Sequence, residues 1–247
     1  MRHKVEIYSN MLDYQAEMAF PFERPEYESL EWLRAKNIFD FGTGNATYLK
    51  KLAKIFPDKD FVGCEIDKEM LQVARKNTED SKNITILSAD EVKTIKKNSI
   101  DFFIFRLVLL HVPDRSVAYE LTKTIGRNDA SILVIDAYDD YFYSNPEPKI
   151  FLQALKDLRS KSIDRNLFDK VESDLSAYQY KIKTERRIII NNSFPHANEL
   201  MFKYMYCTAE LGKGSPLSSE IQNDLIDWWL NPHSYIQYGV FSKLFVK

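Results

Sequence analysis

Short apolar runs alternate with stretches of helical periodicity through the middle of the chain. Residues 37–41 (NIFDF) are an apolar run, and within 46–56 apolar residues recur at Leu49, Leu52 and Phe56. That spacing is typical of a helix with one buried face. The same analysis predicts further strands over 60–66, 83–89, 99–108 and 131–138, and further helices over 68–77 and 115–127. Strands separated by helices of about 10–15 residues indicate a doubly wound α/β domain with a parallel sheet.

The two ends of the chain depart from this alternation. Residues 1–35 are rich in aromatic side chains and are predicted to be helical. After the fifth strand the sequence predicts a helical insertion at 147–180, a strand at 182–190, helices at 198–211 and 218–230, and a final strand or hairpin at 234–247. Because we find neither an internal repeat nor a linker, we predict one domain with helical additions.

Composition and charge narrow the class of protein. The chain is 45% hydrophobic and 28% charged with a formal net charge of -2, so no overall field attracts nucleic acid or an anionic membrane. The longest apolar run, 102–112, is too short to span a bilayer and contains Arg106. The first residues lack the apolar core of a signal peptide. Cys64 and Cys207 suffice for neither a disulfide framework nor a metal site. We therefore expect a cytoplasmic protein.

Three predicted strand ends carry groups that suit an adenosine-bearing ligand. Gly42 and Gly44, two of only seven glycines, follow the first strand and allow a ligand to approach the backbone. Glu65 ends the second strand 21 residues after Gly44, a spacing that suits an acid binding the two hydroxyls of a ribose. Asp90 and Glu91 follow the third strand and could accept a hydrogen bond from the amine of adenine.

The glycine loop favours one adenosine derivative over another. A dinucleotide places its pyrophosphate on a G-x-G-x-x-G loop, but Thr47 stands where the third glycine belongs. Asp40, two residues before Gly42, would lie poorly beside a pyrophosphate and well beside an ammonium group. S-adenosyl-L-methionine combines adenine, a ribose diol and an ammonium group without a phosphate. The residues therefore favour this ligand.

The ordered set of motifs resembles the class I S-adenosylmethionine-dependent methyltransferases that act on small molecules. IFDFGTGNA is similar to the first motif of that family, with Ala46 replacing its third glycine. FPDKDFVGCEIDKEMLQVARKN, SADEV and IDFFIFRLVLLHVPD are similar to the segments around the next three strands, so the resemblance covers residues 36–138. GRNDAS replaces a common Pro-Gly-Gly turn, and Arg106 stands where many members have Asn, Ser or Cys. The absence of NPPY or DPPY argues against methylation of adenine bases or glutamine amides.

The resemblance implies a fold and a set of cofactor contacts. The expected fold is a mostly parallel, seven-stranded Rossmann-like sheet with helices on both faces and added cap helices. Residues 1–35 would form an N-terminal helical lid, 36–138 the cofactor-binding core, 139–233 the insertion and cap helices with the sixth strand, and 234–247 the final strand. The implied cofactor residues are Asp40, Gly42, Thr43 and Gly44 for the methionine end, Glu65 for the ribose, Asp90 and Glu91 for the adenine, Ile66, and Arg106 largely through its backbone.

The chemistry of methyl transfer leaves several points open. The methyl group is already activated, so the protein mainly aligns the acceptor and excludes water, and the sequence identifies no catalytic residue. His111 is the histidine nearest to the site in chain order, although packing or capping is its commoner use. We expect a small organic acceptor, uncharged or moderately apolar, and no metal. A NAD(P)-dependent oxidoreductase and a non-catalytic binding module are the alternatives. The methylated element and the oligomeric state are not predicted.

Overall fold

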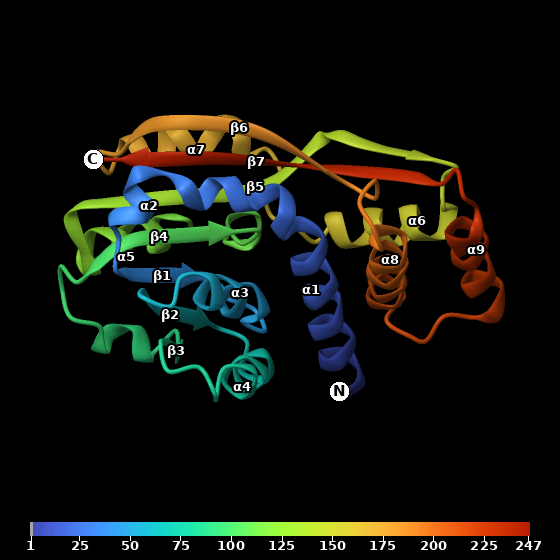
Figure 1. Cartoon of the computed structure of the whole chain (residues 1–247), viewed down its shortest axis with the longest axis horizontal. Coiled ribbons are helices and arrows are strands. Elements are labelled where there is room, and N and C mark those ends of the chain that lie inside the picture. The colour runs from blue at the N-terminus through green and yellow to red at the C-terminus, as the bar shows by residue number, and fades with distance from the viewer. Residues whose placement is uncertain (1) are drawn as a thin grey trace.

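The computed structural model describes residues 2–247 and contains a seven-stranded sheet in the order β3-β2-β1-β4-β5-β7-β6 (Figure 1). The strands are β1 (Asn37–Phe41), β2 (Asp60–Glu65), β3 (Ile84–Ser88), β4 (Ile100–Arg106), β5 (Gly126–Asn145), β6 (Lys181–Asn191) and β7 (Tyr235–Val246). The pairings among β1 to β5 are parallel, and β7 runs antiparallel to both β5 and β6. The predicted fold class, a mostly parallel Rossmann-like sheet, is confirmed.

Helices occupy both faces of this sheet and one end of it. They are α1 (Arg2–Glu23), α2 (Leu30–Arg34), α3 (Thr47–Ile55), α4 (Lys68–Asn77), α5 (Ser116–Ile125), α6 (Lys149–Arg159), α7 (Leu167–Ser176), α8 (Ala197–Lys213) and α9 (Ser219–Leu230), with short 3-10 helices η1 (Arg24–Glu28), η2 (Glu91–Thr94) and η3 (Leu109–His111). Helix α4 has the predicted bounds because the Asp67 side chain caps it, accepting a hydrogen bond of 2.8 Å from the Met70 amide. Within residues 2–247, no helix is long and apolar enough to cross a membrane.

Two hydrophobic layers lie on opposite sides of the sheet. Successive side chains of a strand point to opposite faces, so Phe102 joins the layer under α1, α3 and α8, whereas Phe103 joins the layer under α5 and α7. The central strands are therefore apolar at nearly every position, as buried parallel strands tend to be. This double burial explains why the strands could be recognised from short continuous apolar runs.

Strand β5 is longer than the predicted 131–138. Its residues 139–145 continue alongside β7, where Asn145 pairs with Tyr235, after an irregularity between Tyr138 and Tyr143. This extension is mostly polar and lacks the alternation of a strand, so the distant partner β7 is what makes it one. Figure 1 shows the extended β5–β7 pair reaching past the other strands toward α6, α8 and α9. The segment at 234–247 is accordingly a single strand, not a hairpin.

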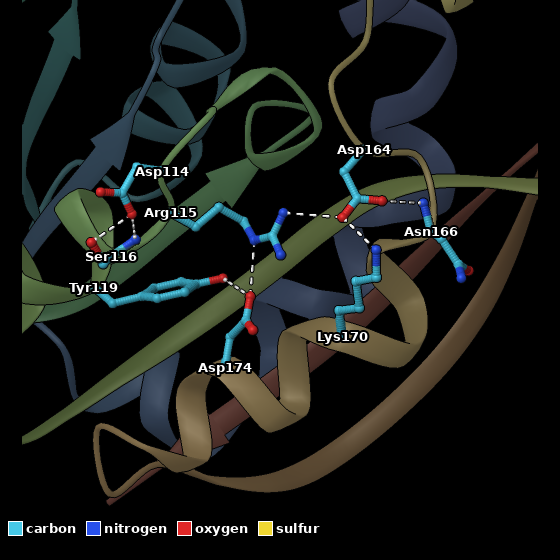
Figure 2. Close-up of polar contacts among 8 residues, drawn as sticks. All are labelled: Asp114, Arg115, Ser116, Tyr119, Asp164, Asn166, Lys170 and Asp174. Atoms are coloured by element: carbon cyan, nitrogen blue, oxygen red, sulfur yellow. Dashed lines mark hydrogen bonds and ion pairs between the residues drawn. The ribbon is translucent and has the colours of Figure 1, made fainter.

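An ion-pair network fixes the loop between α6 and α7. Figure 2 shows Arg115, at the start of α5, between two carboxylates: its Nη1 lies 3.3 Å from Asp164 Oδ2, and its Nε lies 2.9 Å from Asp174 Oδ2. Lys170 Nζ also lies 2.9 Å from Asp164 Oδ2. The amide of Ile163 donates a hydrogen bond of 2.9 Å to the carbonyl of Leu110, next to the end of β4. The loop at 160–166 is therefore held beside the segment that follows β4.

Candidate functional site

Several predicted cofactor residues meet at the carboxyl ends of adjacent strands. Asp40 lies near the end of β1, Glu65 ends β2, and Arg106 ends β4 on the other side of β1. The amides of Gly42 and Thr43 each donate a hydrogen bond of 2.9 Å to the carbonyl of Cys64. These two bonds attach the glycine loop to β2 and bring it beside Glu65.

The backbone of the glycine loop explains its residue types. Gly42, Gly44 and Ala46 all have positive φ, at +73°, +60° and +61°, in the region that favours glycine. A Cβ on Gly42 would lie 2.4 Å from Val108 Cγ2, and a Cβ on Gly44 would lie 2.9 Å from Leu12 Cδ1. Glycine therefore avoids strain at both positions, and at Gly42 a side chain would also collide with the branched Val108, whereas the Leu12 methyl beside Gly44 ends a flexible side chain. Leu12 belongs to α1, so a ligand that lies directly on this loop must compete with α1 for the same space.

Glu65 is almost fully engaged by the backbone around it. The residue is 9% exposed, and its carboxylate accepts three hydrogen bonds, from the amides of Gly44 at 2.9 Å, Ile66 at 2.8 Å and Asp67 at 2.9 Å. Burial raises the pKa of this carboxyl, and the three amides oppose that effect. A carboxylate offers about four acceptor positions, so one remains on Oε2 for a ligand hydroxyl.

Asp40 is a buried acid without a strong counter-charge among the described residues. It is 7% exposed, and burial raises its pKa to about 6. The hydroxyl of Thr43 and the charge of Arg106 lower the pKa, whereas the charge of Glu65 raises it further. A cationic group brought by a ligand would stabilise the charged form of Asp40. The Asp40 carboxylate therefore fits an ammonium group better than a phosphate.

The side chain of Arg106 is occupied by an ion pair that the sequence did not reveal. Its Nε lies 2.7 Å from Oε2 of Glu23, at the end of α1, and its Nη2 lies 3.2 Å from Oε1. The guanidinium carbon also lies 3.9 Å from the centre of the Tyr48 ring. These contacts occupy the side chain of Arg106, and the predicted cofactor contact through its backbone stays a prediction. Glu23 is a lone acid 83 residues away, and no local pattern distinguished it.

The remaining predicted cofactor residues are Ile66 and the two predicted adenine contacts, Asp90 and Glu91, and they lie in different surroundings. Ile66 is 82% exposed, an unusual state for a large apolar side chain, and provides an apolar surface next to Glu65. Asp90 is exposed. Glu91 accepts hydrogen bonds from the Ser88 amide at 2.7 Å and from Arg75 Nη2 at 2.6 Å, so its carboxylate fixes the start of η2 against α4. An adenine contact by Glu91 would have to compete with these two bonds.

Helix α1 is attached to the glycine loop through polar contacts. Asn45 Nδ2 donates hydrogen bonds to the carbonyl and the hydroxyl of Ser9 at 3.0 Å and to Oδ1 of Asp13 at 2.8 Å. Thr47 also donates to Asp13. The Asp13 carboxylate thus lies at the amino end of α3, where a dinucleotide-binding protein holds its pyrophosphate. A second anion is disfavoured there, which weighs against the NAD(P) alternative.

Comparison with protein families identifies the class of protein. The family model described as "Methyltransferase domain" matches residues 34–222, and the chain belongs to this family. The predicted resemblance, and with it S-adenosyl-L-methionine as the cofactor of the class, is confirmed. No curated protein matches the sequence.

Solved structures support the same fold. A candidate sarcosine dimethylglycine methyltransferase from Galdieria sulphuraria is 14% identical, with a TM-score of 0.56 over 86% of this chain and 78% of that one. The YcgJ protein from Bacillus subtilis is 17% identical, with a TM-score of 0.54 over 86% and 92%. A SAM-dependent methyltransferase from Aquifex aeolicus is 15% identical, with a TM-score of 0.50 over 84% and 81%. At these identities the comparison shows the fold alone.

Proposed function

We propose that this protein transfers the methyl group of S-adenosyl-L-methionine to a small organic acceptor by direct displacement. The observation that carries the proposal is the pair of acids beside the glycine loop. Asp40 is buried without a strong counter-charge in the described part of the chain and suits the ammonium group. Glu65 keeps one acceptor position open and suits the ribose. No phosphate would have to be accommodated at the amino end of α3, where Asp13 lies.

The remaining cofactor contacts follow the family pattern. Gly42, Thr43 and Gly44 line the methionine end, Ile66 lies against the adenine, and Asp90 and Glu91 are the candidates for its amine. Because Glu65 has one free position, binding of both ribose hydroxyls requires the carboxylate to release a backbone amide, most simply that of Gly44. The boundaries proposed above, with residues 1–35 as a lid and 139–233 as the cap, are part of the same proposal.

The cofactor, when bound, supplies a methyl group activated by a positively charged sulfur. In a direct displacement, this methyl group would pass to a lone pair of the acceptor, and the electrons of the carbon–sulfur bond would remain on sulfur. The chain's own contribution is to orient the two molecules and to exclude water. We assign no general base. Burial and the charge of Arg165 lower the pKa of His111, which makes this side chain a weaker base than a free histidine.

Calorimetric titration tests the cofactor and its site together. We expect S-adenosylhomocysteine to bind the intact protein and NAD not to bind. Glu65→Ala removes the ribose acceptor and should weaken binding at least tenfold, since each lost charged hydrogen bond is worth about 1.5–3 kcal/mol. The matched control is Glu69→Ala, an exposed acid four residues along the chain in α4. Preferential binding of NAD, or equal affinity in the two variants, would refute the proposal.

A further inference from the structure

Two arginines share a single carboxylate on the cap side of the molecule. Arg165, in the loop held by the α6–α7 network, binds Asp139 of β5 through Nε at 2.5 Å and Nη2 at 2.6 Å. Arg159, at the end of α6, approaches the same Asp139 with Nη2 at 3.3 Å. Asp136, fully buried, is the other acid that acts on Arg165. The positive charge of Arg165 is therefore well balanced by carboxylates, whereas the charge of Arg159 is not.

Arg159 is incompletely satisfied in its surroundings. Its guanidinium carbon lies 5.0 Å from the centre of the Phe142 ring, and its Nε is buried without a hydrogen-bond partner among residues 2–247. A buried donor of a charged group that lacks a partner costs free energy, so it marks a place where an acceptor is missing. Roughly a quarter of the side chain is still exposed, at 27%, so a ligand could reach it.

Two stacked tyrosines connect these arginines with the cofactor residues. The rings of Tyr204 in α8 and Tyr238 in β7 are nearly parallel, with centres 6.2 Å apart. Tyr204 lies close enough to Arg159 and Arg165 for their charges to lower its pKa, although burial raises it. The hydroxyl of Tyr238 is buried, has no partner in the part of the chain that the structure describes, and is close to the Glu23–Arg106 ion pair. Unsatisfied polar atoms of the described residues thus lie at both ends of this tyrosine pair.

We infer that the acceptor is a small anion, with a carboxylate or phosphate group bound by Arg159 and its methyl-accepting atom toward Tyr238 and Arg106. This inference rests on the proposed function, and it replaces the uncharged acceptor expected from composition. A guanidinium forms paired hydrogen bonds with either anion, and the missing partner of Nε can be one of its oxygens. The network around Arg115 fixes the adjoining loop (Figure 2). Arg165 of this loop binds Asp139, and Asp139 in turn holds Arg159 from one side.

Anion binding to the full chain tests this inference without knowledge of the acceptor. With S-adenosylhomocysteine at saturation, inorganic phosphate is titrated and followed by its phosphorus NMR line width, and acetate by proton saturation transfer. We expect at least one of the two to bind. Arg159→Gln should weaken that binding about tenfold or more, because it removes one charged bidentate contact. Arg159→Lys keeps the charge but not the paired donors and should show a smaller loss.

The matched control is Arg127→Gln, an exposed arginine near the amino end of β5 that pairs with Asp101 at 3.0 Å. Binding retained in this control and lost in Arg159→Gln supports the inference. No binding of either anion to the unmodified protein, or equal binding in Arg159→Gln and the control, overturns it. Thermal unfolding checks that the variants are folded, and Arg159→Lys serves if the glutamine variant is not. Calorimetry with S-adenosylhomocysteine measures cofactor binding separately. A failure of the proposed function can therefore be distinguished from a failure of the anion-binding inference.

Discussion

Replacement of Gly42 by alanine tests two reasons for a glycine in the glycine loop, namely its backbone conformation and the close approach of Val108. The change adds a methyl group at φ +73° that would lie 2.4 Å from Val108 Cγ2. The positive φ alone costs about 1–2 kcal/mol for an L-residue, part of which is offset by about 0.4–1 kcal/mol of lost entropy in the unfolded chain. Overpacking against Val108 adds about 1–3 kcal/mol. We expect a total destabilisation of about 2–4 kcal/mol.

A second glycine provides the control for this estimate. Gly214, at the end of α8, has nearly the same φ of +71°, but no atom of the described residues lies within 4 Å of the position that a Cβ would take there. Gly214→Ala should therefore show only the conformational cost, about 0.5–1.5 kcal/mol. The difference between the two variants measures the close approach of Val108.

Urea unfolding with and without S-adenosylhomocysteine distinguishes the two variants. A ligand that binds only the folded state raises the unfolding midpoint, so its effect reports binding. We expect the ligand to stabilise Gly214→Ala as it does the unmodified protein and to have little effect on Gly42→Ala. If both variants are equally stable and equally stabilised by the ligand, then neither the packing argument nor the placement of the ligand on this loop is correct.

Three further predictions follow from buried groups. The pKa of Asp40 is about 6 in the folded protein against 3.8 for the unperturbed group, so the folded state binds its proton more tightly and stability should fall by about 3 kcal/mol as pH rises from about 4 to about 6. Asp40→Asn should reduce this slope in urea titrations at each pH, and an unchanged slope would exclude Asp40 as its source. Glu23→Gln leaves Arg106 buried without its counter-charge and should lower the free energy of unfolding by about 3–5 kcal/mol, measured by the same titration; a loss below about 1 kcal/mol would contradict the importance of this pair. Burial raises the pKa of the Cys64 thiol to about 12 and that of Cys207 to about 11, so a thiol reagent should modify neither at neutral pH until the protein unfolds, and rapid labelling of the native protein would contradict this.

The parts of the fold that the sequence predicted are those with a local cause. The strands 37–41 and 60–66 were recognisable because both faces of the sheet are buried, and helix 68–77 because its apolar face and its Asp67 cap lie within one short segment. The loop at Gly42 was recognisable because few residue types other than glycine tolerate its backbone. The extension of β5 was not, because its pairing depends on β7, far along the chain, where Asn145 meets Tyr235.

The site residues that were missed act across long sequence separations. Asp13 and Glu23 are ordinary acids in a helical sequence, and only the docking of α1 brings them to Asn45 and Arg106. Arg159 lies in the segment 147–180, which the sequence predicted only as a helical insertion within the cap. Its meeting with Asp139 depends on the placement of α6 beside the extended part of β5. No periodicity or spacing in the sequence carries this information.

The position of α1 has a thermodynamic consequence for the two ligands. This helix contacts α3 and the glycine loop on one side and α8, which carries Tyr204, on the other (Figure 1). Under the proposed function, a cofactor on the glycine loop would meet Leu12 of α1, and a shift of α1 would also change its contact with α8. If bound cofactor changes the affinity for the acceptor by some factor, then bound acceptor changes the affinity for the cofactor by the same factor. The coupling between the two ligands is then set by the energetics of one helix.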